Sequence, residues 1–400
     1  MGKIRTLDDV AVEGKRVLVR ADLNVPMKDG KVLDDLRISR ILPTLHELSR
    51  KGAKVIVLSH FDRPGGKPVP DMSLRPVATV LAMALGLHVT FIEDCVGPTA
   101  HAFADQLKPG GVALLENTRF HQGEEANDPA FAKEIAALGD LFVNDAFSCA
   151  HRAHVSTEGL ARVLPAVAGR NMEVELKSLS AVLETPERPV AAVVGGAKVS
   201  TKLELLGNLC QRVDRLIIAG GMANTFFLAA GHEIGRSLCE RDMAPLAKAI
   251  LDAASDCGCK VVLPQDVVVA RELRTGAPSK VVPAARVPAD HMILDIGPVA
   301  AAQFGNLIAE SHTLVWNGPL GAFETPPFDA GTVFVARAAA ALTAEGRLTS
   351  VAGGGDTLAA LRAAGIADEF SYVSTAGGAF LEWLEGKELP GVKILETAAA

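Results

Sequence analysis

Short runs of apolar, mostly β-branched residues alternate with turns and with helical patterns along the whole chain. This alternation is typical of βαβ units that build a parallel sheet, so the expected fold class is α/β. The turns differ between the two halves: apolar runs of the first half end in charged or hydrogen-bonding residues, and those of the second half end in glycines. Since ligands of open parallel sheets bind beyond the carboxyl ends of the strands, this difference predicts two domains that bind two different ligands.

The first half is expected to contain strands at residues 16–20, 53–59, 111–115 and 140–143. Guanidinium groups bind phosphate and carboxylate in a bidentate way, so several arginines at one sheet edge predict a site for a small anion. Each arginine alone is more readily explained as a surface charge, but five separate segments that all place such groups at strand ends favour a site. The candidates are Asp22, Asn24, Arg37, His60, Arg63, Arg119 and Arg152.

Histidines and cysteines give weaker signals. His60, His151 and His154 could be metal ligands, but no carboxylate or cysteine completes a set, so we expect them to bind anions or to pack. Cys257 and Cys259 are close in sequence without a second pair at zinc-ligand spacing, and we interpret all six cysteines as reduced thiols. We expect Glu116 to be structural.

In the second half, strands are expected at 189–194, 215–219, 313–316, 348–352 and 370–374, each followed by glycine. Glycine at a strand end lets a phosphate approach the backbone and the next helix N-terminus. Such a helix is expected at 358–364, where Asp356 or Thr357 caps the helix and Asp356 could also hold Mg²⁺. Lys198 and Lys202 would share a helix face, which favours an anion between them. Neither a P-loop motif nor a dinucleotide-binding glycine motif is present.

Size and composition narrow the class of protein. The chain has 400 residues, of which 49% are hydrophobic and only 4% aromatic, which suits two or three globular domains with aliphatic cores. The net charge of −7 does not favour general nucleic-acid binding. No apolar signal core or membrane-length apolar run is found, so a cytoplasmic location is expected. A helix at 171–184 would connect the halves, and the apolar tail 389–395 has no helix of its own after it.

Nine motifs, in order along the chain, resemble those of the phosphoglycerate kinase family. Five of them lie in the first half, and the two at 144–147 and 150–154 are separated by two residues. The motifs are RADLNVP at 20–26, SHFDRP at 59–64, LLENTRFH at 114–121, NDAF at 144–147, AHRAH at 150–154, GGAKV at 195–199, VWNGPLG at 315–321, GGGDT at 353–357 and LEGKELPG at 384–391. Their combination and order make the resemblance highly specific.

The resemblance implies two Rossmann-like domains, each a doubly wound parallel sheet, joined by a hinge helix. Residues 1–170 would bind 3-phosphoglycerate, with the tail 387–400 packing back on them. Residues 171–186 would form the connector, and residues 187–386 would bind magnesium and ADP or ATP. The implied reaction is the reversible, in-line transfer of a phosphoryl group from 1,3-bisphosphoglycerate to ADP after hinge closure, in glycolysis and gluconeogenesis, by a cytoplasmic monomer.

The resemblance also assigns residues by matching position. The glycerate would be bound by the seven first-half candidates given above, and Asp356 would bind magnesium. Catalytic roles fall to Arg37, Lys202, Gly354 and Gly377. The nucleotide would be surrounded by Gly196, Lys198, Lys202, Gly220, Gly221, Leu294, Asn317, Pro319, Glu324, Gly354, Gly355, Asp356 and Thr357.

Three positions depart from the family pattern. Asp62 stands where the family usually has glycine, Ala376 replaces another usual glycine, and the loop before Arg37 reads Leu33-Asp-Asp-Leu36. Two other classes remain as alternatives: a dehydrogenase or sugar-nucleotide transferase of the same α/β build, and a non-catalytic two-domain protein that binds an anion or a nucleotide. The missing dinucleotide motif argues against the dehydrogenase, and an activity measurement separates an enzyme from a binding protein.

Overall fold

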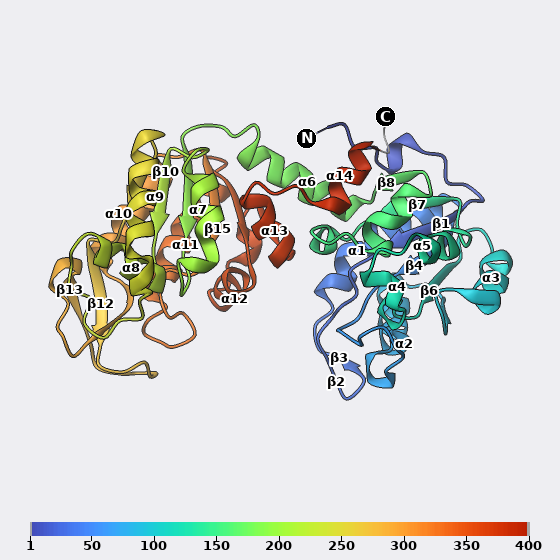
Figure 1. The fold of residues 1–400 in the computed structure, drawn as a ribbon, viewed down its shortest axis with the longest axis horizontal. Helices are drawn as coiled ribbons and strands as arrows, with labels where there is room; N and C mark the ends of the chain where they lie inside the picture. Colours follow the sequence, from blue (N-terminus) through green and yellow to red (C-terminus); the bar gives the residue numbers. More distant parts are fainter. Residues whose placement is uncertain (1, 398–400) are drawn as a thin grey trace. The chain divides into compact units, whose positions relative to one another are not determined.

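The computed structural model describes residues 2–397. The chain forms two compact units: one comprises the chain up to Lys177 and the segment from Glu388 onward, and the other comprises Ser178–Lys387. Each unit contains a six-stranded sheet whose strands are all parallel (Figure 1). The predicted α/β class with two parallel-sheet domains is therefore confirmed. Within the described residues, no helix has the length and apolar character needed to cross a membrane.

The sheet of the first unit has the strand order β5-β6-β4-β1-β7-β8. The four predicted runs form strands whose ends differ from the prediction by at most one residue, whereas β5 and β8 were not predicted. The strands are β1 (Arg16–Arg20), β4 (Lys54–Leu58), β5 (Val89–Ile92), β6 (Val112–Leu115), β7 (Leu141–Asn144) and β8 (Ala166–Ala168). The main helices are α1 (Leu36–Arg50), α2 (Arg75–Leu85), α3 (Gly97–Gln106), α4 (Gln122–Glu125) and α5 (Pro129–Ala136).

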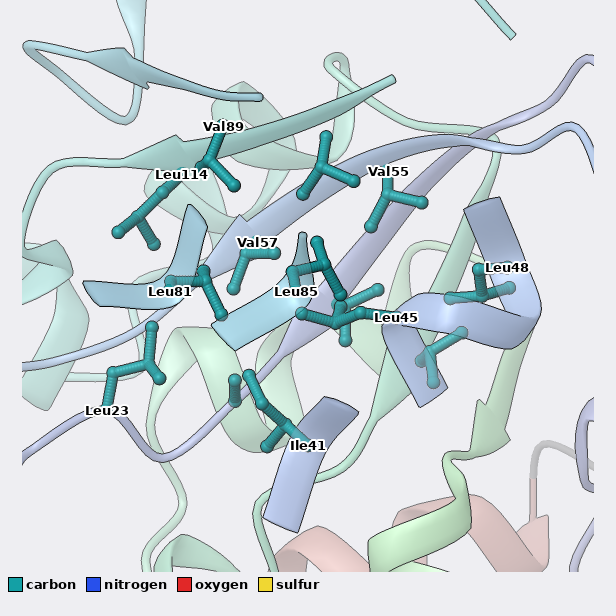
Figure 2. Packing of buried hydrophobic residues seen from close by; sticks show 14 of the residues in the cluster. Leu23, Ile41, Leu45, Leu48, Val55, Val57, Leu81, Leu85, Val89 and Leu114 are labelled. Carbon is teal, nitrogen blue, oxygen red and sulfur yellow. The ribbon is translucent and has the colours of Figure 1, made fainter. Parts of the chain in front are cut away.

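One face of this sheet packs against α1 and α2. Figure 2 shows the buried side chains, with Leu45 and Leu48 of α1 and Leu81 and Leu85 of α2 lying beside Val57 and its neighbours on the strands. All of these residues are at most 3% exposed. Burying each aliphatic side chain contributes about 1.5–3 kcal/mol, and helices on the sheet explain why its strands are continuous apolar runs.

The second unit has the strand order β11-β10-β9-β15-β16-β17. Its five predicted strands are present, with ends that differ by up to two residues. The strands are β9 (Val190–Val194), β10 (Arg215–Ile218), β11 (Lys260–Val262), β15 (Thr313–Asn317), β16 (Thr349–Gly353) and β17 (Tyr372–Ser374). The helices are α7 (Leu203–Leu209), α8 (Gly221–Ala229), α9 (Ala244–Asp256), α10 (Pro298–Ala309), α11 (Ala330–Ala344), α12 (Gly355–Ala363) and α13 (Gly377–Leu384).

A small antiparallel sheet in the second unit was not predicted. It consists of β12 (Asp266–Ala270) between β13 (Ser279–Pro283) and β14 (Met292–Ile296). The uniform βαβ pattern expected from the sequence is wrong here. Strand β13 is mostly exposed, so it has no continuous apolar run to mark it.

The predicted connector helix is present as α6 (Arg170–Leu183), and the division between the units falls within it. The apolar tail, for which the sequence predicted no secondary structure, is itself helical, because Pro390–Thr397 forms α14. This helix packs on the first unit: the Gly391 amide donates to the Ala150 carbonyl at 2.9 Å, and the Gly391 carbonyl accepts from Asn144 Nδ2 at 3.3 Å.

Candidate active site

A cluster of guanidinium groups surrounds His60 at the carboxyl edge of the first unit's sheet. Burial lowers the pKa of His60 well below its usual value, and the positive charges of neighbouring arginines lower it further. The imidazole is therefore neutral at physiological pH. The arginines that act on it are Arg20, Arg119, Arg37 and Arg152. Such a concentration of positive charge favours an anionic ligand.

Arg37, in the first turn of α1, is held in place by residues that follow β1. Its Nη1 donates to Asp22 Oδ1 at 3.1 Å and to the Asn24 carbonyl at 2.8 Å. Asp22 also accepts from Ser148 Oγ at 2.5 Å. The guanidinium side chain remains 34% exposed, so it is oriented by the protein and still accessible to a ligand.

Arg119 is fixed in a similar way by backbone groups. It lies in η3 (Thr118–Phe120), and its Nη1 donates to the Asp62 carbonyl at 2.7 Å. The Asp62 amide in turn donates to Asn24 Oδ1 at 3.0 Å. Asp62 has φ +50°, a conformation that favours glycine but that aspartate tolerates better than most residues. Asp62, which stands where the family usually has glycine, therefore hydrogen-bonds through its backbone to both Arg119 and Asn24.

Arg20 was missed by the sequence analysis. It is the last residue of β1 and only 1% exposed. Its Nε donates to Ser156 Oγ at 2.8 Å, and its Nη2 lies 2.9 Å from His60 Nδ1. Ser156 Oγ donates at 2.5 Å to Glu124, a fully buried carboxylate. An arginine at the carboxyl end of a central strand whose interior is apolar is the signal that could have identified Arg20.

The remaining glycerate candidates are less constrained. Arg152 is half-buried and its Nε donates to His151 Nε2 at 3.2 Å. Arg63 is exposed and makes no hydrogen bond or ion pair with any residue in 2–397. The expectation that no carboxylate or cysteine accompanies the histidines is wrong, because Asp22 and Cys149 have potential donor atoms within 4.8 Å of His60. Glu116 is structural as expected: it accepts from the Leu74 amide at 2.9 Å at the start of α2.

The second unit contains a cavity of about 470 Å³ beyond the strand ends. Apolar side chains, among them Phe227, Leu238 and Met292, form part of its wall, as expected for a site that accepts a flat organic ring. Seven of the predicted nucleotide residues line it: Gly196, Gly220, Gly221, Leu294, Pro319, Glu324 and Asp356.

A second group of predicted residues is joined by hydrogen bonds at the ends of β9, β15 and β16. The Lys202 ammonium donates to the Gly195 carbonyl at 2.6 Å, and to Asn317 at 2.6 Å (Oδ1) and 3.1 Å (carbonyl). Asn317 Nδ2 donates to the Gly353 carbonyl at 2.9 Å, and the Gly318 amide donates to Thr357 Oγ1 at 2.7 Å. All three N–H groups of Lys202 are therefore engaged within this unit.

Burial lowers the pKa of Lys202 to about 8, and the charge of Asp356 opposes this shift. The prediction that Lys198 and Lys202 share a helix face is wrong. Lys202 ends the short 3₁₀ turn Ser200–Lys202 and is partly buried, whereas Lys198 precedes that turn and is exposed. Local charge spacing could not reveal that only one of the two lysines turns inward.

Glycine rather than a polar side chain precedes α12. The expectation that Asp356 or Thr357 caps the helix is wrong, because Gly354 is the N-cap residue with φ +101° and no side-chain cap is present. Gly355 begins the helix, and Gly377 begins α13 directly after the buried Ala376. Asp356 is exposed, lines the cavity and accepts no hydrogen bond from the described residues, which fits a carboxylate available to a phosphate-bound Mg²⁺.

Comparisons with known proteins agree with this arrangement. The phosphoglycerate kinase family model matches residues 7–387. Phosphoglycerate kinases of Ruegeria sp. and Rhizorhabdus wittichii are 61% and 62% identical to the chain, and each comparison covers 98% of the chain and 99% of the relative. The structure of phosphoglycerate kinase from Coxiella burnetii superimposes with a TM-score of 0.93 at 44% identity and covers 100% of both chains. The corresponding structure from Pyrococcus horikoshii gives a TM-score of 0.84 at 32% identity and covers 99% of both. The chain therefore belongs to the phosphoglycerate kinase family.

Proposed function

We propose that the protein catalyses the reversible transfer of a phosphoryl group from 1,3-bisphosphoglycerate to ADP, which gives 3-phosphoglycerate and ATP. The observation that carries this proposal is the pair of different sites in a member of this family. One is an arginine cluster at the edge of the first sheet, and the other is a partly apolar cavity with Lys202 and Asp356 near it in the second unit.

The first site suits a phosphorylated carboxylic acid. Its arginines present fixed N–H donors, and the neutral imidazole of His60 does not repel an anionic ligand. We assign the glycerate to Asp22, Asn24, Arg37, His60, Arg63, Arg119 and Arg152, and add Arg20 as a buried residue that orients His60.

The second site suits a nucleotide. The cavity between Phe227 and Met292 would accept the base, and the phosphates would lie near Lys202 and the N-terminus of α12. Asp356 would hold Mg²⁺, which would neutralise part of the phosphate charge when bound. Lys202 must exchange at least one of its three hydrogen bonds to reach a phosphate oxygen.

The chemistry needs positioning rather than proton transfer. Both the carboxylate and the nucleotide phosphate that act as nucleophiles are ionised at neutral pH, so no general base is required. Arg37 and Lys202 would neutralise the phosphoryl group during transfer, and the backbone at Gly354 and Gly377 would contribute donors at helix starts. Because the two ligands belong to different units, we propose that a hinge movement precedes in-line transfer and excludes water. We also propose a monomer in the cytoplasm.

A coupled assay tests the function. Purified protein, 3-phosphoglycerate, ATP and Mg²⁺ are combined with glyceraldehyde-3-phosphate dehydrogenase, and loss of NADH is followed. We expect turnover that requires both substrates and Mg²⁺. Arg37→Ala should lower kcat by about 10²–10³, as for removal of a preorganised charged donor, with little change in the affinity for nucleotide.

Arg50→Ala is the matched control, since Arg50 lies at the other end of α1 and, among residues 2–397, its side chain donates only to the His46 carbonyl. Equal loss of kcat and nucleotide affinity in Arg37→Ala would contradict its proposed role. Folded protein that binds both ligands without any turnover would instead indicate the non-catalytic binding protein, which family membership does not favour.

A further inference from the structure

A second cluster of potential metal ligands lies away from the His60 cluster. Asp94 and Cys95 come soon after β5, and His121 directly follows η3. One donor atom from each residue lies within 4.8 Å of the other two. His121 Nε2 is 2.7 Å from Asp94 Oδ1, and the Cys95 amide donates to the same oxygen at 2.7 Å. The structure therefore brings a thiol, an imidazole and a carboxylate together.

The surrounding charges distinguish this cluster from the chemically similar one at Asp22, His60 and Cys149. There the strongest charges acting on the imidazole are four arginines, which repel a cation. Around Cys95 the strongest charges acting on the sulfur are the carboxylates of Asp94, Glu124 and Glu116. Two triads with the same donor types thus lie in opposite electrostatic environments, and only the one at Cys95 favours a cation.

The cluster at Cys95 is also accessible from one side. Cys95 is 1% exposed, whereas the side chains of Asp94 and His121 are 49% and 30% exposed. An ion can therefore reach the cluster past the partly exposed carboxylate and imidazole. The His121 ring is oriented by stacking on Phe131, with ring centroids 4.9 Å apart.

We propose that Asp94, Cys95 and His121 form a binding site for a borderline divalent cation such as Zn²⁺, separate from the proposed magnesium site. Zn²⁺ accepts cysteine sulfur, histidine nitrogen and carboxylate oxygen at about 2.0–2.3 Å, and tetrahedral ligands at that distance lie roughly 3.3 Å or more apart. The 2.7 Å hydrogen bond between His121 Nε2 and Asp94 Oδ1 would therefore open to admit the ion. Mg²⁺ prefers oxygen ligands only and does not compete for a thiolate. The ion would tie the segment after β5 to the segment after η3 and stabilise the first unit.

Cobalt(II) provides a spectroscopic probe of this site. The intact protein is titrated with Co²⁺ in excess Mg²⁺ and a non-chelating reductant. Thiolate coordination gives a near-ultraviolet charge-transfer band, and tetrahedral geometry gives visible bands. Zn²⁺ should then displace Co²⁺ and remove both. We expect Cys95→Ser to abolish the charge-transfer band, and His121→Gln to weaken Co²⁺ binding at least about tenfold.

Two controls keep the test specific. Cys149→Ser changes the matched triad near His60, and Cys257→Ser removes the exposed thiol. Both variants should keep the bands of the wild type. His121→Gln leaves Cys95 in place, so a failure of Cys95→Ser to fold does not prevent a decision. Absence of a thiolate band in the wild type, its persistence in a folded Cys95→Ser, or its loss in Cys257→Ser would overturn the proposal.

Discussion

Lys202 gives the most quantitative prediction, because its charge is maintained in a buried position. Its pKa is lowered from 10.5 to about 8, mainly by burial. Since one pKa unit equals about 1.4 kcal/mol, holding the charged form costs roughly 3 kcal/mol at neutral pH relative to a solvated lysine. The unfolded chain binds more protons than the native one between the two pKa values, so this term makes folding stability rise from about pH 8 to about pH 10.5.

Ligand binding should show the opposite trend. A nucleotide phosphate near the ammonium favours the protonated form, so ADP affinity should be constant from about pH 7, where the phosphates are ionised, to about pH 8, and fall above it by up to about tenfold per pH unit. Lys202→Met should bind ADP more weakly at neutral pH and lose this dependence. Isothermal titration calorimetry with ADP over this range measures both effects.

Lys198→Met is the control, since Lys198 is exposed and four residues earlier. It should preserve the pH dependence of the wild type. A flat affinity in the wild type, or a pH dependence that survives in Lys202→Met, would refute the assignment of Lys202 to the phosphates.

Three further predictions concern charge, burial and close packing. Asp62→Asn keeps a residue that tolerates φ +50° but removes the carboxylate, so it should tighten 3-phosphoglycerate binding by up to about fivefold, equal to about 1 kcal/mol. Asp62→Gly should tighten binding at least as much. Calorimetry that shows weaker binding by both variants would contradict the electrostatic argument. Burial raises the pKa of Asp145 to about 7, so between about pH 4 and about pH 7 the native state keeps a proton on this carboxyl that the unfolded chain releases. The free energy of unfolding should therefore fall by roughly 4 kcal/mol over this range, and denaturant titrations should show a smaller fall in Asp145→Asn. The same pH profile in Asp145→Asn as in the wild type would contradict this prediction. A Cβ at Gly195 would clash with the Pro319 carbonyl oxygen, so Gly195→Ala should lower the free energy of unfolding by about 3 kcal/mol, as followed by the fluorescence of the buried Trp316. Gly207→Ala, with open space around its Cβ, should not destabilise the protein, and equal effects of the two substitutions would refute the packing argument.

Local sequence patterns were sufficient where a feature depends on neighbouring residues. The strand at Arg16–Arg20 and the polar residues after it could be identified because a buried parallel strand is a continuous apolar run. The antiparallel sheet could not, because β13 is exposed and pairs with strands that its own sequence does not specify.

Contacts between distant segments explain the other errors. Arg20 is buried because Ser156, 136 residues later, accepts its hydrogen bond, and no local pattern encodes that partner. Lys202 turns inward because Asn317 lies 115 residues away in the chain but beside it in space. The Asp94, Cys95 and His121 cluster likewise joins the ends of two strands that are neighbours only in the folded sheet.

The stereochemistry of transfer tests the central claim most directly. ATP whose γ-phosphate is made chiral with oxygen isotopes is incubated with 3-phosphoglycerate, Mg²⁺ and the protein, and the configuration of the transferred phosphoryl group is determined. Direct in-line transfer between two ligands predicts inversion at phosphorus, with no release of the phosphoryl group when 3-phosphoglycerate is omitted. Retention of configuration, or transfer of the group to water instead of the carboxylate, would contradict the account.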